Sequence, residues 1–178
     1  MVLFVRVGNM RIVVTALFML AIFGRTAGAQ PAHARPDVYV TIASATDHTP
    51  GEQAIDRARN AETIRRVLLD ALSRTPQLTS TVADVRRFGL DVRKIDIDVV
   101  QLRVERSGED VVVSAQVRLV VCDDRGRMLS ILSGGATARR PARLVRAEQL
   151  ADLRRDALEG AVHGMFAPLR THLLRASV

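Results

Sequence analysis

IDIDVVQLRVERSGEDVVVSAQVRLVV, residues 95–121, predicts a long antiparallel hairpin. Apolar and polar residues alternate on both arms, which is typical of strands that bury one face. The break at 107–110 supplies the glycine and acidic residues that short hairpin loops favour. On the second arm one face is apolar, and the other includes Ser114, Gln116 and Arg118. We therefore predict a sheet with one buried face and one polar face.

The first arm of this hairpin changes parity at Val99–Val100. Before this point the apolar residues occupy odd positions, whereas Leu102 and Val104 occupy even ones. Because side chains alternate between the two faces of a strand, the change indicates one extra residue in the arm. The sequence predicts either a β-bulge at Val99–Val100 or a strand that begins there.

Residues 1–29 have the three parts of a secretory signal peptide. Arg11 precedes an apolar run at 12–23, and small residues at 27–29 form a cleavage motif before Gln30. The run is shorter than the roughly 20 residues of a membrane-spanning helix, so no span is expected after cleavage. An uncleaved N-terminal anchor remains the alternative. No cysteine follows the motif, which gives no support to a lipoprotein anchor.

Cleavage would leave a flexible leader at 30–36, rich in alanine and proline, and a single α+β domain at 37–178. A domain of roughly 150 residues is large enough to bury a core without disulfides. The protein is therefore expected to be exported, either to the periplasm or out of the cell. Met10 is an alternative start, because a basic residue and the apolar run follow it directly.

The basic residues of the chain do not indicate binding to nucleic acid. Removing the three arginines of 1–29 lowers the formal net charge from +7 to +4. All but one of the 26 basic residues are arginines, the exception being Lys94. One tyrosine, five phenylalanines and no tryptophan leave few rings on which bases can stack. We therefore expect no nucleic-acid partner.

Periodicity and turn residues outline the other elements. The predicted elements are a strand at 38–42, a helix from Asn60 or from as early as Glu52 to 75, a short helix from Thr79 or Ser80 to Phe88, a third antiparallel arm at 128–137 and a long amphipathic helix at 146–175. The order β-α-α-β-β-β-α predicts an α+β two-layer sandwich, with helices on one face of a mainly antiparallel four-stranded sheet. Gly160 and Gly164, one turn apart in the last helix, predict a close approach to the sheet.

Cys122 and the adjoining residues 123–124 are the first candidates for chemistry. A lone cysteine at the end of a strand is typically a small buried residue. The alternative is an intermolecular disulfide, since an odd cysteine in an exported protein has no internal partner. The two aspartates at 123–124 lack the further oxygen donors that a calcium loop needs. We interpret 122–127 as a turn and expect no metal site.

The four histidines and the SGG segment at 133–135 match no catalytic or metal-binding motif. His163 and His172 are nine residues apart in one predicted helix, which puts them on opposing sides of it. His33 and His48 lie in the leader and in a loop. The SGG segment lacks the flanking glycine of a nucleophile elbow and the GK[ST] ending of a phosphate loop. We expect no catalytic residue, no cofactor and no enzymatic activity, although distant residues can converge in a fold.

Four arginines between the third arm and the last helix form a candidate binding site. They are Arg139, Arg140, Arg143 and Arg146. Guanidinium groups bind phosphate or carboxylate through paired hydrogen bonds, so the cluster would suit an anionic lipid or a cell-wall polymer. The alternative interpretation is a solvated linker in an arginine-rich protein, because surface charges usually serve solvation.

The order of these elements resembles that of small periplasmic modules such as the lipoprotein activators of penicillin-binding proteins and the N-terminal domain of TolB. The resemblance rests on topology and implies only a fold of this kind, so it carries no functional residue onto this chain. The lipoprotein cysteine of the activators is absent at the predicted cleavage point.

These observations favour a noncatalytic exported interaction or accessory module that binds an envelope protein. The partner would meet either the polar face of the hairpin or a free edge of the sheet. The alternative is binding of an anionic envelope ligand through the arginines at 139–146, and an enzyme is the third hypothesis. The identity of the partner, the oligomeric state and the strand order stay open at this stage.

Overall fold

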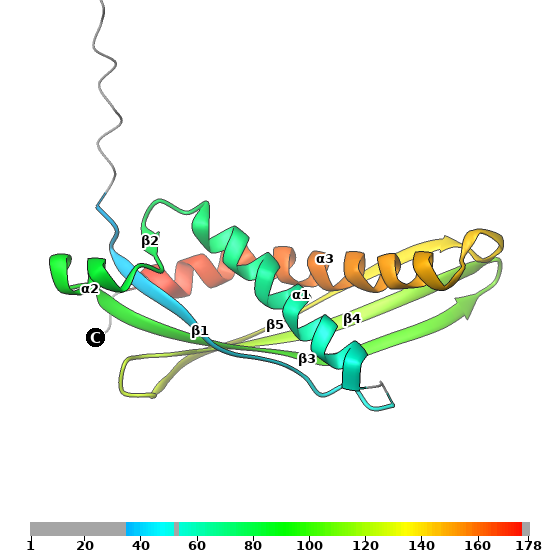
Figure 1. Cartoon of the computed structure of the whole chain (residues 1–178), viewed down its shortest axis with the longest axis horizontal. Coiled ribbons are helices and arrows are strands. Elements are labelled where there is room, and N and C mark those ends of the chain that lie inside the picture. The colour runs from blue at the N-terminus through cyan, green and yellow to red at the C-terminus, as the bar shows by residue number, and fades with distance from the viewer. Residues whose placement is uncertain (1–34, 52–53, 176–178) are drawn as a thin grey trace, which may run out of the picture. The chain divides into compact units, whose positions relative to one another are not determined.

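A mixed sheet with helices against one of its faces forms the described part of the chain (Figure 1). The computed structural model describes residues 35–51 and 54–175. The predicted signal peptide at 1–29 and most of the predicted leader at 30–36 lie outside the described residues. The elements in chain order are β1 (Val38–Asp47), α1 (Ala54–Ser73), β2 (Leu78–Thr79), α2 (Val82–Phe88), β3 (Asp91–Ser107), β4 (Asp110–Cys122), β5 (Met128–Pro141), the 3-10 turn η1 (Ala142–Leu144) and α3 (Ala147–Leu174).

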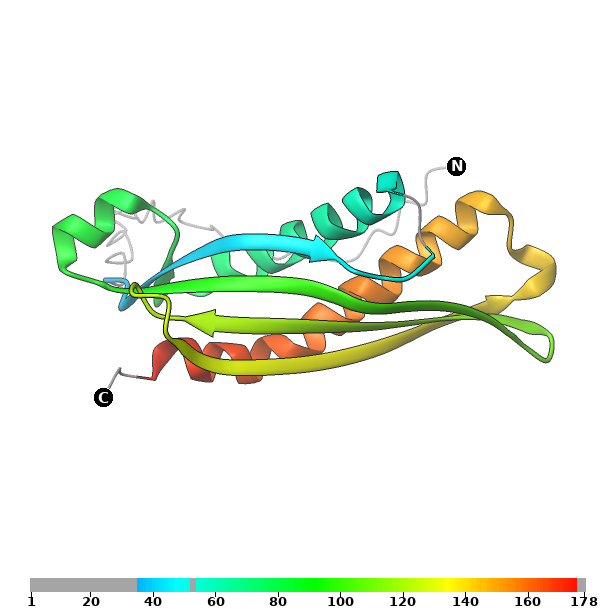
Figure 2. The same cartoon turned by 90° about the horizontal axis from the view of Figure 1, so that it is seen from below.

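The strands lie in the order β2-β1-β3-β4-β5 (Figure 2). β1 runs parallel to both β2 and β3, whereas β3, β4 and β5 form an antiparallel meander. The predicted α+β class is confirmed, but the prediction of a mainly antiparallel four-stranded sheet is wrong in two details. β2 adds a fifth strand whose two residues are too few to show a periodicity. The chain returns from β1 to β3 through α1 and α2, and such a crossover joins parallel strands.

β3 and β4 form the predicted hairpin. Ser107 pairs with Asp110 across a two-residue loop, in which Gly108 has a φ of 60°. Glycine adopts this left-handed conformation without a steric cost, whereas other residues do not. β3 also extends further back than expected, because it begins at Asp91 rather than at Ile95.

Val100 is the extra residue of a β-bulge in β3, as predicted. The residues on either side of Val100 pair with Val117 and Gln116, which are neighbours on β4. The bulge restores the alternation that the parity change had broken. As a result Leu102, on the far side of the bulge, is buried together with Val99 on the near side.

α1 and α3 cover the apolar face of the sheet. The odd-numbered residues of β4 from Val113 to Val121 are buried in a core that they share with both helices. The helical side of this core consists of Ile64, Val67, Leu68, Leu72, Leu153, Ala157, Leu158, Ala161, Val162, Met165, Leu169 and Leu173. Steps of three and four residues place each helix's apolar side chains on one stripe. Since burial of a large aliphatic side chain contributes about 1.5–3 kcal/mol, this face is the main source of stability.

α3 packs closely against β5 where the strand has small residues. A Cβ atom added at Gly134 would lie 2.3 Å from Cγ of Met165. Gly160 faces Ala136, and a Cβ atom added at Gly160 would lie 3.0 Å from that of Ala136. The predicted close approach is therefore confirmed for Gly160. It is wrong for Gly164, because no atom lies within 4 Å of a Cβ added there.

Asp123 organises the predicted turn between β4 and β5. Its carboxylate accepts hydrogen bonds from the backbone N–H groups of Arg125 and Arg127 at 3.0 and 2.8 Å, and from Nε of Arg127 at 2.7 Å. Burial alone would raise the pKa of Asp123, but the hydrogen bonds and charge of Arg127 outweigh burial and hold the pKa below its ordinary value of 3.8. The ionised carboxylate of Asp123 therefore stabilises the turn between β4 and β5.

We expect Gly134→Ala to lower the free energy of unfolding by about 1–3 kcal/mol, because the new methyl group would overlap Met165 in a packed core. Gly164→Ala is the matched control. Gly164 is exposed and has open space around its Cβ position, so alanine there should stabilise the helix by about 0.5–1 kcal/mol. Urea unfolding followed by circular dichroism measures both effects. A Gly134→Ala protein as stable as the parent would contradict the close packing.

We expect Asp123→Asn to lower the midpoint of thermal unfolding at neutral pH and to have little effect in strong acid. The pKa of Asp123 is depressed in the folded state, so its ionised form stabilises the fold above the ordinary value of 3.8. This stabilisation is lost as the pH falls through the folded-state pKa. Asp124→Asn, at an exposed neighbour, is the control. Calorimetry across this pH range tests the prediction, which a pH-independent difference from the parent would refute.

Candidate functional site

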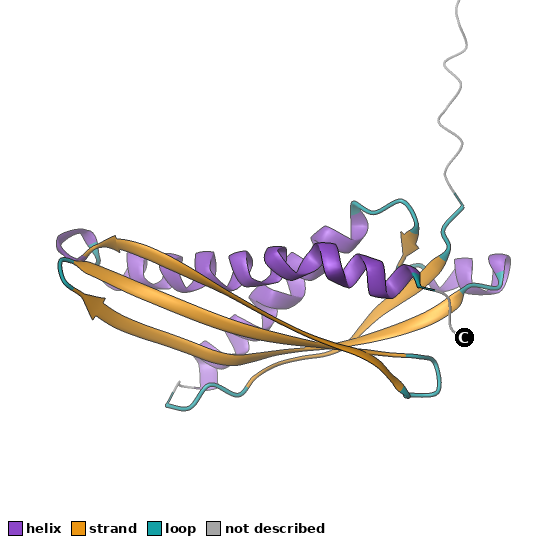
Figure 3. Ribbon diagram, turned by 180° about the vertical axis from the view of Figure 1, so that it is seen from behind, coloured by secondary structure: helices purple, strands orange, loops and turns teal. Residues whose placement is uncertain are grey.

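One face of the sheet is not covered by the described helices. Both α1 and α3 lie behind the strands when the sheet is seen from below (Figure 2), and Figure 3 shows the strands and helices from the back. We call this side the open face, and it carries the side chains that alternate with the buried ones. Ser114 is half-buried there, whereas Gln116 and Arg118 are exposed. The polar face expected for this arm of the hairpin is therefore accessible.

Polar residues from distant parts of the chain meet on the open face. This polar cluster consists of Ser44, Thr46, His48, Asp96, Asp98 and Arg118. The parallel register of β1 and β3 places the serine and the threonine each beside an aspartate. The antiparallel register of β3 and β4 adds the arginine, and the loop after β1 adds the histidine.

Asp98 is the centre of the polar cluster. Its Oδ1 lies 2.7 Å from Nδ1 of His48 and accepts a hydrogen bond from the Thr46 hydroxyl at 3.2 Å. Its Oδ2 accepts a hydrogen bond from Arg118 at 3.1 Å. The Asp98 side chain is 14% exposed, whereas those of His48 and Arg118 are 71% and 49% exposed. One shielded carboxylate thus fixes two accessible basic side chains at the surface.

The hydroxyl groups of the polar cluster do not form a nucleophile–base pair. The Ser44 hydroxyl donates to Asp96, and the Thr46 hydroxyl donates to Asp98. A hydroxyl nucleophile is activated when it donates to a base such as the imidazole of His48. In the contacts observed, Asp98 instead orients Arg118 at the surface.

A groove of about 380 Å³ lies beside Arg118 on the open face. The groove is lined by Val100, Gln116, Val117, Arg118, Ser133, Gly134 and Gly135. Gly135 of β5 faces the groove and contributes no side chain, which leaves the groove unfilled between β4 and β5. Ile131, which is 53% exposed, lies two residues before Ser133 on the same strand, so apolar surface adjoins the groove.

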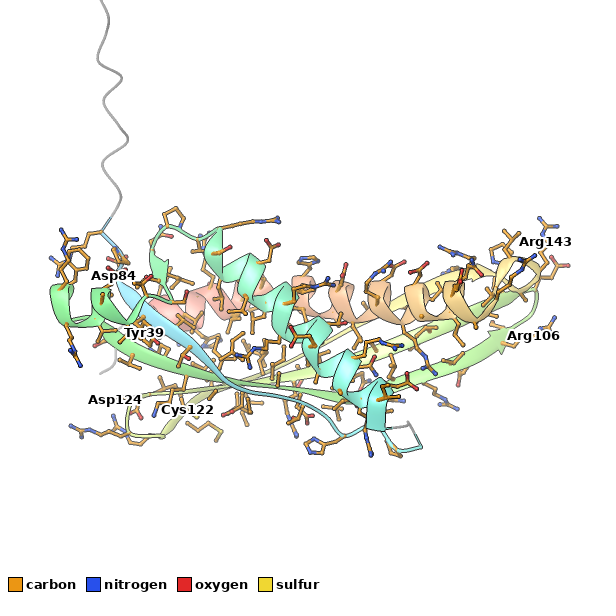
Figure 4. The ribbon with its side chains drawn as sticks, viewed as in Figure 1. Tyr39, Asp84, Arg106, Cys122, Asp124 and Arg143 are labelled. Carbon is orange, nitrogen blue, oxygen red and sulfur yellow. The ribbon has the colours of Figure 1, made fainter. Side chains whose placement is uncertain are left out.

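The four arginines predicted to bind an anion lie toward one end of the sheet without sharing one face. Arg139 is exposed and is one of the open-face residues of β5, whereas Arg140 is half-buried on the helix side. Arg143 lies in η1, and Arg146 is the N-cap residue of α3. Figure 4 shows Arg106 of β3 at the same end as Arg143. The binding role of the four arginines stays a prediction.

Cys122 lies at the end of β4 and is half-buried (Figure 4). It pairs with Met128 across the turn that Asp123 organises. Its thiol is free, so an intermolecular disulfide remains a prediction. The position next to a hydrogen-bonded turn gives the cysteine a fixed backbone, whichever role it has.

Neither a metal-binding cluster nor a membrane-spanning helix is found among the described residues. In this part of the chain, no three His, Cys, Asp or Glu side chains lie close enough together to hold a metal ion. On α3, His163 is exposed and His172 is half-buried. Within the same ranges, none of the helices has the length and hydropathy needed to cross a membrane.

Sequence reasoning missed the polar cluster. Ser44 and Asp96, which are in contact, are 52 residues apart in the chain. The one available signal was the alternation of short polar residues at 44–48 and at 96–98, which puts each set on one face of a strand. Nothing in that alternation indicates that the two strands are neighbours in parallel register.

Comparison with protein-family models and with curated proteins finds no match for this chain. Solved bacterial structures share its fold. A DUF330-family protein from Xanthomonas campestris superposes with a TM-score of 0.53 at 13% identity, covering 80% of this chain and 89% of that one. The hypothetical protein CT253 from Chlamydia trachomatis superposes with a TM-score of 0.51 at 11% identity, covering 77% of this chain and 98% of that one. A minor lipoprotein from Acinetobacter baumannii superposes with a TM-score of 0.47 at 12% identity, covering 81% of this chain and 98% of that one. At 13% and 11% identity, the likeness to the Xanthomonas campestris and Chlamydia trachomatis proteins establishes the α+β fold alone.

Proposed function

We propose that this chain is a noncatalytic accessory module of the bacterial envelope and that its open face binds an envelope protein. One observation carries the proposal. Two helices cover one face of a five-stranded sheet, and the described elements leave the opposite face uncovered. Accessible apolar surface ringed by polar residues is typical of protein interaction sites.

The chemistry of the open face suits a protein partner. Ile131 and Val100 are 53% and 41% exposed, and they lie at or near the groove. Protein interfaces combine apolar contacts with a polar rim, and arginine is enriched among the residues that contribute most binding energy. Arg118 is held by Asp98 at 3.1 Å, which reduces the side-chain entropy lost when a partner binds it.

The noncatalytic and envelope parts of the proposal have separate support. In the polar cluster, the hydroxyls of Ser44 and Thr46 donate to carboxylates and not to His48, which favours binding over nucleophilic catalysis. The envelope location rests on the signal-peptide pattern of 1–29. The fold is compatible with both parts and decides neither.

A second candidate function is binding of an anionic envelope ligand at the arginine-rich end of the sheet. Arg106 joins the arginines of 139–146 at that end, which favours this function (Figure 4). However, Arg139 and Arg140 lie on opposite faces of β5, so one small anion would not meet both on a single face. We therefore rank this function second.

We expect the full chain with a C-terminal tag to retain an envelope protein from extracts of its source bacterium, even at high salt. Ile131→Asp should abolish this retention, because it puts a charge on the apolar part of the open face. The matched control is Ile55→Asp, since Ile55 is 66% exposed but lies on α1. Mass spectrometry of the retained proteins measures the difference.

Equal recovery by the Ile131→Asp and Ile55→Asp proteins would contradict the open face as the interface. Retention of only an anionic lipid or glycan, lost as salt rises, would favour the second candidate function, because salt screens exposed charges. Both substitutions are at exposed positions, so thermal unfolding close to that of the parent should confirm that neither acts by unfolding the chain.

A further inference from the structure

β5 is a long strand with one uncovered edge. It has 14 residues, and the strand order places it at the margin of the sheet with β4 on one side. Among the described residues, no backbone hydrogen bond beyond the sheet ladders reaches its outer edge between Leu129 and Arg140. Unpaired N–H and C=O groups along such an edge form a template for another strand.

The edge of β5 lacks the devices that usually block pairing. Natural edge strands are protected by charged residues, prolines or bulges. Residues 129–138, LSILSGGATA, include no charged residue and no proline. The register shift in β5 lies at its beginning, next to Cys122 on β4, and the pairing from Ser130 to Pro141 is regular. The strand is therefore able to accept a neighbour over most of its length.

We propose that an extended segment of the partner adds to the outer edge of β5 as a sixth strand. This inference rests on the proposed function and specifies how the partner binds. The open-face residues of β5 are Ile131, Ser133, Gly135, Thr137 and Arg139. Since facing side chains of paired strands are in contact, the added segment carries apolar residues beside Ile131 and an acidic residue beside Arg139.

Charge distinguishes such a partner from a second copy of this chain. Arg139 and Arg140 form no ion pair within the described ranges. β5, residues 128–141, contains these two arginines and no aspartate or glutamate. If two copies paired through β5, neither strand would supply a carboxylate to the arginines of the other. An acidic segment from a different protein supplies it, so the edge favours a heterologous partner.

The groove adds a side-chain pocket to this backbone contact. It is lined by Ser133 and Gly135 of β5 and extends to Arg118 on β4. A side chain on the added strand next to Gly135 meets no Cβ atom and can reach across into the groove. Strand addition of this kind takes its affinity from the backbone and its specificity from such pockets.

Synthetic peptides test the proposal on the full, tagged chain. The probes are fluorescent strands of about twelve alternating valine and threonine residues, the length of a long strand, with two aspartates or two lysines at one end. Both chain directions are made, so that parallel and antiparallel addition are covered. Fluorescence anisotropy at low ionic strength should show the better aspartate peptide binding about fivefold more tightly than its lysine counterpart.

Substitution of Arg139 then tests the register. Arg139→Glu should reverse the preference, so that the lysine peptide binds more tightly than the aspartate peptide. Arg170→Glu makes the same charge change at an exposed position on α3 and should leave the preference unchanged. An unaltered preference in Arg139→Glu would overturn the proposed register.

N-methylation tests whether the backbone makes the contact. An added strand uses only one of its edges, so methylating alternate peptide nitrogens on that edge should abolish binding, whereas methylating the other set should not. Equal binding by the two methylated peptides, or no binding by any peptide at millimolar concentration, would contradict strand addition.

Dimerisation of the chain would identify a different occupant of the edge. If the chain dimerises as its concentration rises, and Arg139→Glu favours the dimer, the occupant is a second copy and not a different protein. Either result would leave the open face as the proposed interface, provided that Ile131→Asp abolishes retention of the envelope protein and Ile55→Asp does not.

Discussion

α3 packs against the small residues of β5 so closely that a Cβ atom at Gly134 would lie 2.3 Å from Cγ of Met165. Met165 occupies the space that a side chain at Gly134 would need, so the helix lies directly on the strand and closes the core above β4 and β5. Gly135, the next residue, faces the opposite way and leaves the groove beside Arg118 open. Adjacent glycines thus allow close packing on one face and a hollow on the other, because neighbouring residues of a strand point to opposite sides.

The open face and the edge of β5 offer different contacts within a short distance of each other. The face presents side chains, among them Ile131 and an arginine that Asp98 holds in place. The edge presents backbone groups, which recognise an extended chain largely regardless of its sequence. A partner that uses both would gain affinity from the backbone and selectivity from Arg118 and the groove. The arginines at the end of the sheet would then contribute mainly to the rate of association, as exposed charges commonly do.

Local patterns predicted the elements of this fold better than their arrangement. The parity change at Val99–Val100 identified the bulge, and the helical period predicted 146–175 where α3 spans 147–174. These features depend on neighbouring residues alone. β2 was not predicted because two residues are too few to show a periodicity. The parallel pairing of β1 with β3 was not predicted because it depends on a crossover of some 40 residues. The polar cluster depends on that pairing, so no local pattern revealed it.

The bulge at Val100 shows how one backbone irregularity can decide which residues meet water. Gln101 and Leu102 continue the alternation set by Val99 because the bulge accommodates the extra residue, Val100. Regular pairing through Val100, without the bulge, would leave the composition of the arm unchanged, yet it would turn Leu102 outward and Gln101 inward. For this strand, the bulge is therefore under as strict a constraint as the chemical character of the residues on either side of it.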